Sequence, residues 1–390
     1  MIRPGRTIAA GVLVAAAAAG GVTYFVTRSP ARQVSQSQRV RRSGGSRRPG
    51  GSSGSGSGGA PFRVVSTTPH SGASGVSGTA RLSITFSQPV SKSSPMPKLN
   101  PSVPGNWQVK GRRLVFKPTT AFVPLSQETL TIPGGQGGLV DAAGKALSGP
   151  VSDNFTVENG SILRLQQLLS LLDYSPLAWQ PAGPAIAPSD SAAQLQAMYS
   201  PPAGSFSWRD SGWPARLQAL WQEGSYNVFT RGLVMEFQAD HGLIVNGQVS
   251  GGLWNALLLA LSNGSRNTGG YNYAIASKAP PESLTIWHNG QVVFRSPANT
   301  GIPQSPTPSG NFNVYARYRN EIMKGTNPNG TPYADPVQFV AYFHDGDAVH
   351  YFPRAAYGIP QSLGCVELPL AEAARAWPYL AYGTIVSVVN

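Results

Sequence analysis

The spacing of the apolar residues changes twice along this chain of 390 residues, and each change marks a different kind of folding unit. Between residues 61 and 158 apolar and polar residues alternate, as in LSITF at 82–86, and this alternation predicts half-buried strands. From Ser161 to residue 265 the apolar residues recur at intervals of three and four, which predicts helices packed along one face. Alternation returns from Leu284 onward. The pattern predicts folded domains in series rather than a single core.

The composition supports short elements joined by many turns. The chain contains 45 glycines and 34 prolines but only 12% charged residues, which favours β-rich domains over long helical bundles. Its single cysteine, Cys365, cannot form a disulfide within the chain. Hydrophobic cores alone must therefore stabilise the fold.

Residues 1–28 have the features of an export signal. The run from Thr7 to Thr27 carries no charge and, at about 1.5 Å per helical residue, matches the roughly 30 Å of a bilayer core. Arg3 and Arg6 precede it, as in the basic start of a signal sequence. We expect a signal anchor that contacts the membrane through residues 7–27, with a cleaved signal peptide as the alternative.

Residues 29–60 are rich in Arg, Gly and Ser and are predicted to form a disordered tether, because they cannot build a core. Residues 1–60 contain nine arginines and no acidic residue, so they contribute +9 of the formal net charge of +13. The folded remainder is only mildly basic, so no nucleic-acid partner is expected.

The stretches SGASGVSGTARLSITFSQPV and RRLVFKPTTAFVPLSQETLTI resemble bacterial Ig-like domains of exported proteins. The resemblance implies a β-sandwich over residues 61–158 that acts as a spacer.

The stretches RLQALW and VMEFQADHGLIVNGQVSGGLWNALL resemble the three-helix peptidoglycan-binding domain. The resemblance covers residues 161–265, with an unusual Pro- and Gly-rich insertion at about 174–213, and it implies glycan as a partner. Read by their own chemistry, the three large apolar side chains of the motif are expected in the core rather than on a ligand platform: Phe237, Leu243 and Trp254.

Cys365 stands in the segment QSLGCVEL, fifteen residues after His350. A thiol is a useful nucleophile only as the thiolate, which needs a base or cation nearby. Gly364 allows close backbone approach, and successive amides at such a turn can hold an oxyanion. The residues alone leave two interpretations open, a catalytic nucleophile or a small buried apolar side chain.

Four motifs resemble the L,D-transpeptidase catalytic domain over residues 271–390: NTGIPQSPTPSGNFNVY, DAVHYF, YGIPQSLGCVELP and GTIVSVV. The resemblance implies a mainly-β domain without a cofactor or metal. It implies that Cys365 is the nucleophile, that His350 is its base, and that Ser362 and Gly364 shape the loop beside the oxyanion hole.

Three positions depart from the family pattern. Leu363 stands where the motif has a second His, and Glu367 stands where Arg or Asn is common, which inverts the local charge next to the bound substrate. Tyr351 replaces a small residue after the base, so we expect its side chain to narrow the cleft while its carbonyl orients His350.

Two further residues are expected to contact substrate because they flank the motifs. These residues are Tyr342 and Arg354. The guanidinium of Arg354 has two possible partners, a carboxylate of a peptidoglycan stem peptide or the side chain of Glu367.

The resemblance implies acyl transfer between peptidoglycan stem peptides, which builds cell-wall cross-links and places the domain outside the cytoplasm, in the cell envelope. Two alternatives stay open: an L,D-carboxypeptidase that uses water as acceptor, and a catalytically inactive wall-binding protein.

Two other enzyme classes fit the sequence less well. The segment HDGDAVH (344–350) contains His344, Asp345, Asp347 and His350, but its spacing does not suit helix ligands and its centre is typical of a hairpin turn, so we expect no metal. A serine penicillin-binding enzyme needs Ser-x-x-Lys, and no lysine of the chain has a serine three residues before it.

Overall fold

The computed structural model describes residues 60–390, which belong to one compact unit, Gly59–Asn390. The predicted signal segment and all but the last residue of the predicted tether lie outside the described residues. Within residues 60–390, no helix has the length and apolar character needed to span a bilayer.

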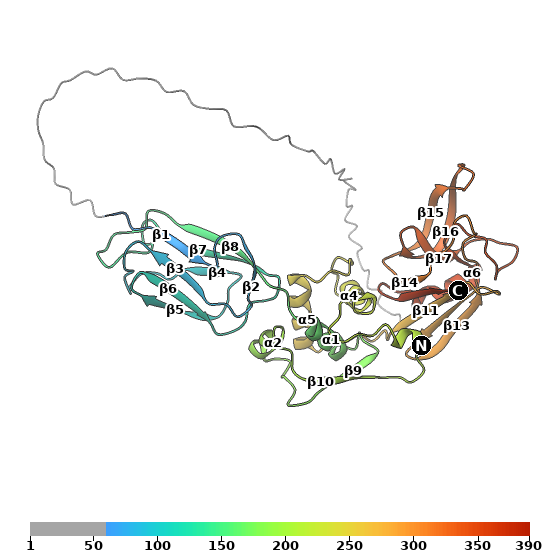
Figure 1. Cartoon of the computed structure of the whole chain (residues 1–390), viewed down its shortest axis with the longest axis horizontal. Coiled ribbons are helices and arrows are strands. Elements are labelled where there is room, and N and C mark those ends of the chain that lie inside the picture. The colour runs from blue at the N-terminus through green and yellow to red at the C-terminus, as the bar shows by residue number, and fades with distance from the viewer. Residues whose placement is uncertain (1–59) are drawn as a thin grey trace, which may run out of the picture. The chain divides into compact units, whose positions relative to one another are not determined.

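The first domain is a sandwich of two four-stranded sheets, as the alternating pattern predicts (Figure 1). The strand orders are β1-β3-β6-β5 and β2-β8-β7-β4. The alternating apolar side chains of β3, β6, β7 and β8 are buried between the sheets. The strands are β1 (Val64–Thr68), β2 (Ala73–Val76), β3 (Leu82–Phe86), β4 (Lys98–Asn100), β5 (Gly105–Lys110), β6 (Arg113–Pro118), β7 (Gln127–Ile132) and β8 (Val151–Val157).

The second region contains more structure than the predicted three helices. Its Pro- and Gly-rich insertion contains a two-stranded antiparallel sheet and a short helix. The elements are α1 (Ile162–Leu171), β9 (Leu177–Pro181), α2 (Ser191–Ala197), β10 (Gly204–Trp208), α3 (Ala215–Gln218), α4 (Val228–Asp240) and α5 (Gly251–Asn263).

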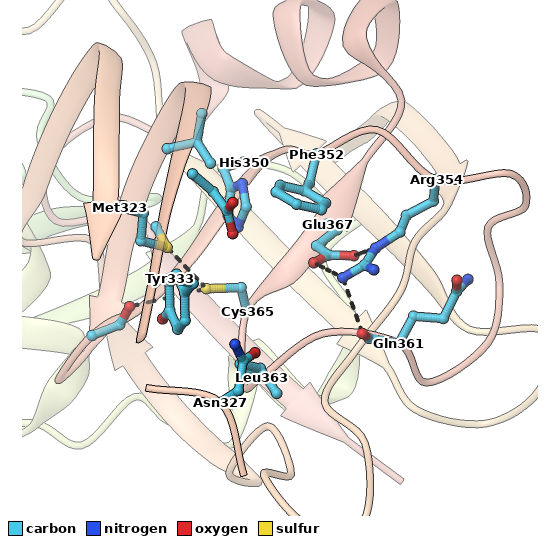
Figure 2. Close-up of a pocket in the computed structure, with 13 residues that line it drawn as sticks. Met323, Asn327, Tyr333, His350, Phe352, Arg354, Gln361, Leu363, Cys365 and Glu367 are labelled. Carbon is cyan, nitrogen blue, oxygen red and sulfur yellow. Dashed lines mark hydrogen bonds and ion pairs between the residues drawn. The ribbon is translucent and has the colours of Figure 1, made fainter. Parts of the chain in front are cut away.

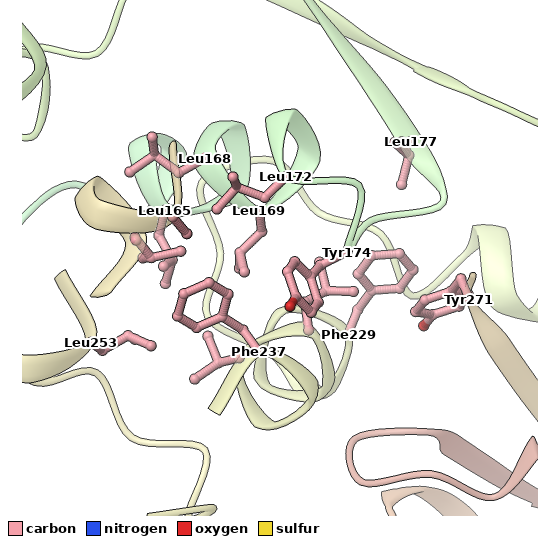
Figure 3. Close-up of a cluster of buried hydrophobic side chains, with 14 of the residues drawn as sticks. Leu165, Leu168, Leu169, Leu172, Tyr174, Leu177, Phe229, Phe237, Leu253 and Tyr271 are labelled. Atoms are coloured by element: carbon pink, nitrogen blue, oxygen red, sulfur yellow. The ribbon is translucent and has the colours of Figure 1, made fainter. Parts of the chain in front are cut away.

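Side-chain caps set the start of the three longest helices of this region. Ser161, Asn227 and Ser250 each accept a backbone N–H from the first turn of α1, α4 and α5. These helices bury one common cluster (Figure 3), in which Phe237 and Trp254 have no exposed surface, while Leu243 packs at its edge. The expected core placement is confirmed for Phe237 and Trp254, whereas Leu243 is only partly buried. The resemblance to a peptidoglycan-binding domain stays a prediction.

The third domain contains a five-stranded sheet, β13-β12-β11-β19-β14, and a four-stranded sheet, β15-β16-β17-β18. Its strands are β11 (Asn272–Ser277), β12 (Ser283–His288), β13 (Gln291–Pro297), β14 (Gly310–Asn313), β15 (Ala316–Thr326), β16 (Pro332–His344), β17 (Asp347–Tyr351), β18 (Val366–Leu368) and β19 (Ile385–Val389). Helix α6 (Leu370–Ala376) and the 3-10 turn η1 (Trp377–Tyr379) follow β18. The β12–β13 turn has positive φ at Asn289 and Gly290, as its sequence predicts.

Strand β11 belongs to two cores because its side chains alternate between the two faces of its sheet. Ala274 and Ala276 pack in the core of the third domain. Tyr273, together with Tyr271 just before the strand and Ile385 of β19, packs with the helices of the second region. The second and third domains therefore share buried surface, in contrast to the separate cores that the sequence pattern suggests.

Candidate active site

The parallel pairing of β17 with β18 determines which side chains meet. His350 pairs with Glu367, and Val349 pairs with Val366. Because paired residues of neighbouring strands share a face, His350, Cys365 and Glu367 lie on one face of the sheet. Val349 and Val366 lie on the opposite face, in the domain core. Along these two strands, the valine side chains therefore face the core, and the side chains of His350, Cys365 and Glu367 face the cavity.

His350, Cys365 and Glu367 line a cavity of about 230 Å³ (Figure 2). The long β15–β16 hairpin forms one wall, and the segment from His350 to Glu367 forms the other. The lining residues are Met323, Asn327, Tyr333, Asp335, Val337, Gly346, His350, Phe352, Arg354, Gln361, Leu363, Cys365 and Glu367.

The imidazole of His350 is 3% exposed, and its Nδ1 lies 2.9 Å from the carbonyl oxygen of Tyr351. Because a carbonyl only accepts, Nδ1 carries the proton and the neutral ring leaves Nε2 free to receive one. Burial lowers the pKa of His350 below its usual value. The imidazole is therefore neutral at pH 7 and has the tautomer of a general base.

The side chain of Tyr351 does not narrow this cavity, contrary to the sequence-based expectation. Strand alternation turns it to the opposite face from His350, where it packs against the domain core. Tyr351 contacts the imidazole of His350 through its backbone carbonyl.

The thiol of Cys365 is 8% exposed. Its Sγ accepts the backbone N–H of Ala348 at 3.4 Å and lies 3.9 Å from Sδ of Met323. Burial, with a smaller contribution from the negative charges of Asp347 and Glu367, raises the pKa of Cys365 to about 12, although the hydrogen bond from Ala348 opposes the rise. At neutral pH the side chain of Cys365 is therefore a thiol and not a thiolate.

Ser362 and Gly364 set the shape of the loop before Cys365. The buried hydroxyl of Ser362 donates to the carbonyl of Cys365 at 2.6 Å and accepts the N–H of Gly364 at 3.2 Å. Gly364 has a φ of +118°, and a Cβ there would lie 2.2 Å from Oδ1 of Asp347, so only glycine fits. The N–H of Cys365 has no hydrogen-bond partner within residues 60–390, which leaves it available to an oxyanion.

Arg354 forms a two-pronged ion pair with Glu367, at 2.8 Å through Nε and 2.7 Å through Nη2. The hydrogen bonds to Glu367 raise the pKa of Arg354. Nη2 also donates to the carbonyl of Gln361, and the guanidinium lies 4.6 Å from the centre of the Phe352 ring. Of the two partners considered for Arg354, the structure contains Glu367, whose charge is thereby balanced.

Tyr342 does not line the cavity with His350. It packs against the small apolar cluster of Val337, Val340, Ala348 and Cys365, from the β16 side. Leu363 does line the cavity, and its carbonyl accepts the hydroxyl of Ser305 at 2.9 Å.

The four residues of the HDGDAVH segment do not converge. Nδ1 of His344 lies 3.2 Å from Asp347 and Nε2 lies 3.8 Å from Asp345, whereas His350 faces the cavity. In the described part of the chain, no group of three or more His, Cys, Asp or Glu side chains is arranged to hold a metal ion.

Sequence reasoning missed the contribution of the β15–β16 hairpin. Met323 and Asp335 are paired across the hairpin, and with Tyr333 they project into the cavity. A signal for this was present, because Tyr333, Asp335 and Val337 alternate along the strand and so share one face.

The comparisons with known proteins agree with this arrangement. Residues 271–388 match the family model described as the L,D-transpeptidase catalytic domain, YkuD. Residues 59–157 match the model described as a bacterial Ig-like domain, Big_5. The chain therefore carries an L,D-transpeptidase catalytic domain preceded by a bacterial Ig-like domain.

Several solved structures are similar over part or most of the chain. An L,D-transpeptidase from Mycobacterium smegmatis is 13% identical, with 84% of this chain and 99% of that chain covered and a TM-score of 0.28. L,D-transpeptidase 3 from Mycobacterium tuberculosis, in complex with a faropenem-derived adduct, is 14% identical over 84% and 98%, with a TM-score of 0.28.

The catalytic domain of an Enterococcus faecium L,D-transpeptidase is 27% identical, with 30% of this chain and 95% of that chain covered and a TM-score of 0.28. At these TM-scores the domain assignment rests on the two family models. No curated protein matches the sequence.

Proposed function

We propose that this protein is a peptidoglycan L,D-transpeptidase in which Cys365 is the nucleophile and His350 is the general base. One observation carries the proposal: the two side chains project from neighbouring segments of one sheet into the same cavity, and Nε2 of His350 is free to take a proton. The family match of residues 271–388 supports the same chemistry.

In the first half of the reaction, Nε2 of His350 takes the thiol proton and Sγ of Cys365 attacks the carbonyl of the third residue of a tetrapeptide stem. The N–H of Cys365 stabilises the oxyanion. The C–N bond then breaks, the imidazolium returns its proton to the leaving nitrogen, and terminal D-Ala departs. The product is a thioester on Cys365.

In the second half, an amine from a neighbouring stem attacks the thioester while His350 removes its proton. The C–S bond of the thioester breaks as the new C–N bond cross-links the two stems, and His350 returns the proton to Sγ of Cys365. Water in place of the amine gives a carboxypeptidase. Because peptidoglycan lies outside the membrane, the domain acts there, with the Ig-like domain as a spacer and the N-terminal segment as an anchor.

The resting pair is neutral, so activation accompanies substrate binding. Transfer of the proton from Cys365 to His350 creates two charges in a buried site, which is unfavourable without a ligand. A donor carbonyl at the N–H of Cys365 provides an acceptor for the developing charge. Nη1 of Arg354, which has no hydrogen-bond partner within residues 60–390, lies at the same cavity and can bind a carboxylate of the stem.

The proposal is tested by intact mass spectrometry of the full-length protein after incubation with a tetrapeptide stem, and separately with a carbapenem, an acylating agent of this family. A Cys365→Ala variant is the control. We expect an adduct in the wild type and none in the variant. Cross-linked products identify a transpeptidase, and tripeptide alone identifies a carboxypeptidase.

The main alternative is a catalytically inactive wall-binding protein. Leu363, in place of the family's second His, is the residue that favours it. Folded wild-type protein that forms no adduct with either reagent would replace the enzymatic proposal with this one.

A further inference from the structure

The second domain contains a buried arginine that has no acidic partner. Arg164, in the first turn of α1, is 1% exposed. Nη1 donates to Oε1 of Gln167 at 3.0 Å, and Nη2 donates to Oε1 of Gln194 at 2.5 Å. Both acceptors are neutral amides, and Nε is buried without any hydrogen-bond partner among the described residues.

A buried guanidinium without an acidic partner lowers the folding stability of the ligand-free protein. A guanidinium has five N–H donors, and here two of them are used. Burial lowers the pKa of Arg164 to about 10, with no charged group contributing, so the side chain stays protonated at neutral pH. An unpaired buried charge is strongly unfavourable, and buried charges in proteins are normally paired.

Arg164 lines a cavity of about 170 Å³ between α1, β9 and the end of α5. For comparison, an engineered apolar cavity of about 150 Å³ holds one benzene ring. The remaining walls are almost entirely apolar: Leu171, Trp179, Pro181, Pro184, Ala185, Ile186, Pro188, Pro202 and Leu261.

The charges around this cavity are unbalanced on the positive side. Arg266 also lines it, but that guanidinium forms an ion pair of 2.9 Å with Asp173. No Asp or Glu is among the lining residues. Of the two arginines that line this cavity, Arg164 is therefore the one without an acidic partner among the described residues.

We propose that this cavity binds a small carboxylate with an apolar, ring-sized or smaller body, and that Arg164 pairs with the carboxylate. A singly charged carboxylate suits the site better than a phosphate, because a dianion would lose more hydration energy in so apolar a cavity. Free aliphatic or aromatic acids and peptide C-termini that end in an apolar residue share this chemistry. The site is separate from the catalytic cavity and does not depend on the proposed reaction.

The test is isothermal titration calorimetry of the full-length protein with three probes. Benzoate represents a free acid, N-acetyl-D-alanine represents a peptide terminus, and benzamide is the uncharged control. We expect saturable binding of at least one carboxylate and at least tenfold weaker binding of benzamide. The carboxylate that binds more tightly identifies the source. Equal binding of benzoate and benzamide, or no carboxylate binding at millimolar concentration, would refute the proposal.

Three variants distinguish a binding site from an arginine with a purely structural role. Arg164→Met should abolish carboxylate binding, whereas Arg209→Met, which removes an arginine already paired with Asp173, should leave it unchanged. Ala185→Trp places a large ring at an exposed lining position of the cavity and keeps Arg164 itself, so it keeps the test valid if Arg164→Met fails to fold. Undiminished binding to folded Ala185→Trp would place the ligand elsewhere and overturn the assignment.

Discussion

Replacing Arg354 with methionine tests whether its ion pair with Glu367 stabilises the wall of the active-site cavity. The side chain of Glu367 is 5% exposed and that of Arg354 is 27% exposed. Removing one partner of a buried ion pair costs about 3–5 kcal/mol, because the other charge stays buried and unpaired. Since Arg354 is partly solvated, we expect a loss near the lower end, about 3 kcal/mol.

The loss arises from the charge of Glu367, which the single variant leaves buried without a partner. A double variant, Arg354→Met with Glu367→Leu, removes both charges and should recover most of the loss.

The assay is urea unfolding of the full-length protein, followed by hydrogen exchange of the peptides that contain β17 and β18. Exchange resolves the stability of this sheet from that of the other domains. A loss below about 1 kcal/mol in the single variant, or a double variant as unstable as the single one, would contradict the argument from burial.

Three further predictions address the nucleophile, its loop and the boundary between domains. Iodoacetamide should alkylate Cys365 at pH 7 at least about 100-fold more slowly than free cysteine, because the raised pKa keeps the thiol protonated. The alkylation rate should rise about tenfold per pH unit to about pH 10. A rate that stops rising at a lower pH would show that Cys365 is a thiolate at rest. Gly364→Ala should slow acylation by a carbapenem about 100-fold, since its Cβ collides with Asp347 and displaces the loop; unchanged acylation in mass spectrometry would refute this. Burial and the charge of Asp240 raise the pKa of Glu236 to about 8. The folded state therefore keeps this proton at pH values at which the unfolded state has lost it. The urea midpoint should therefore fall as the pH rises from about 5 to about 8, and Glu236→Gln should flatten that slope.

The local sequence pattern predicted the strands and turns well, but it predicted poorly which strands lie next to each other. Alternation identified the buried strands of the sandwich, and the Asn289-Gly290 pair identified the β12–β13 turn, because each depends on residues close in sequence. The parallel pairing of β11 with β19 joins residues more than a hundred positions apart. Period two tells which face a side chain occupies but not which strand lies next to it.

The site shows the same division. The spacing of His350 and Cys365 allowed them to meet, since one strand and a returning loop fit between them, but their pairing at one site was predicted by the resemblance to the L,D-transpeptidase catalytic domain. The orientation of Tyr351 was also within reach, because a residue that follows an inward-facing histidine on a strand must face away. The position of the β15–β16 hairpin was not, because alternation indicates that Tyr333, Asp335 and Val337 share a face but not that this face lines the cavity with His350.

The two-faced strand β11 also limits how the chain can be divided. Tyr273 and Ile385 have no exposed surface, yet their neighbours include helices α1, α4 and α5 rather than the catalytic core. A fragment that starts at residue 271 would present these side chains to water and lose the burial of two large apolar groups, each worth about 1.5–3 kcal/mol. The helical domain and the catalytic domain must therefore be kept together in evolution and in engineering. A truncation or recombination that separates them exposes an apolar face of the catalytic domain and makes that domain prone to aggregation.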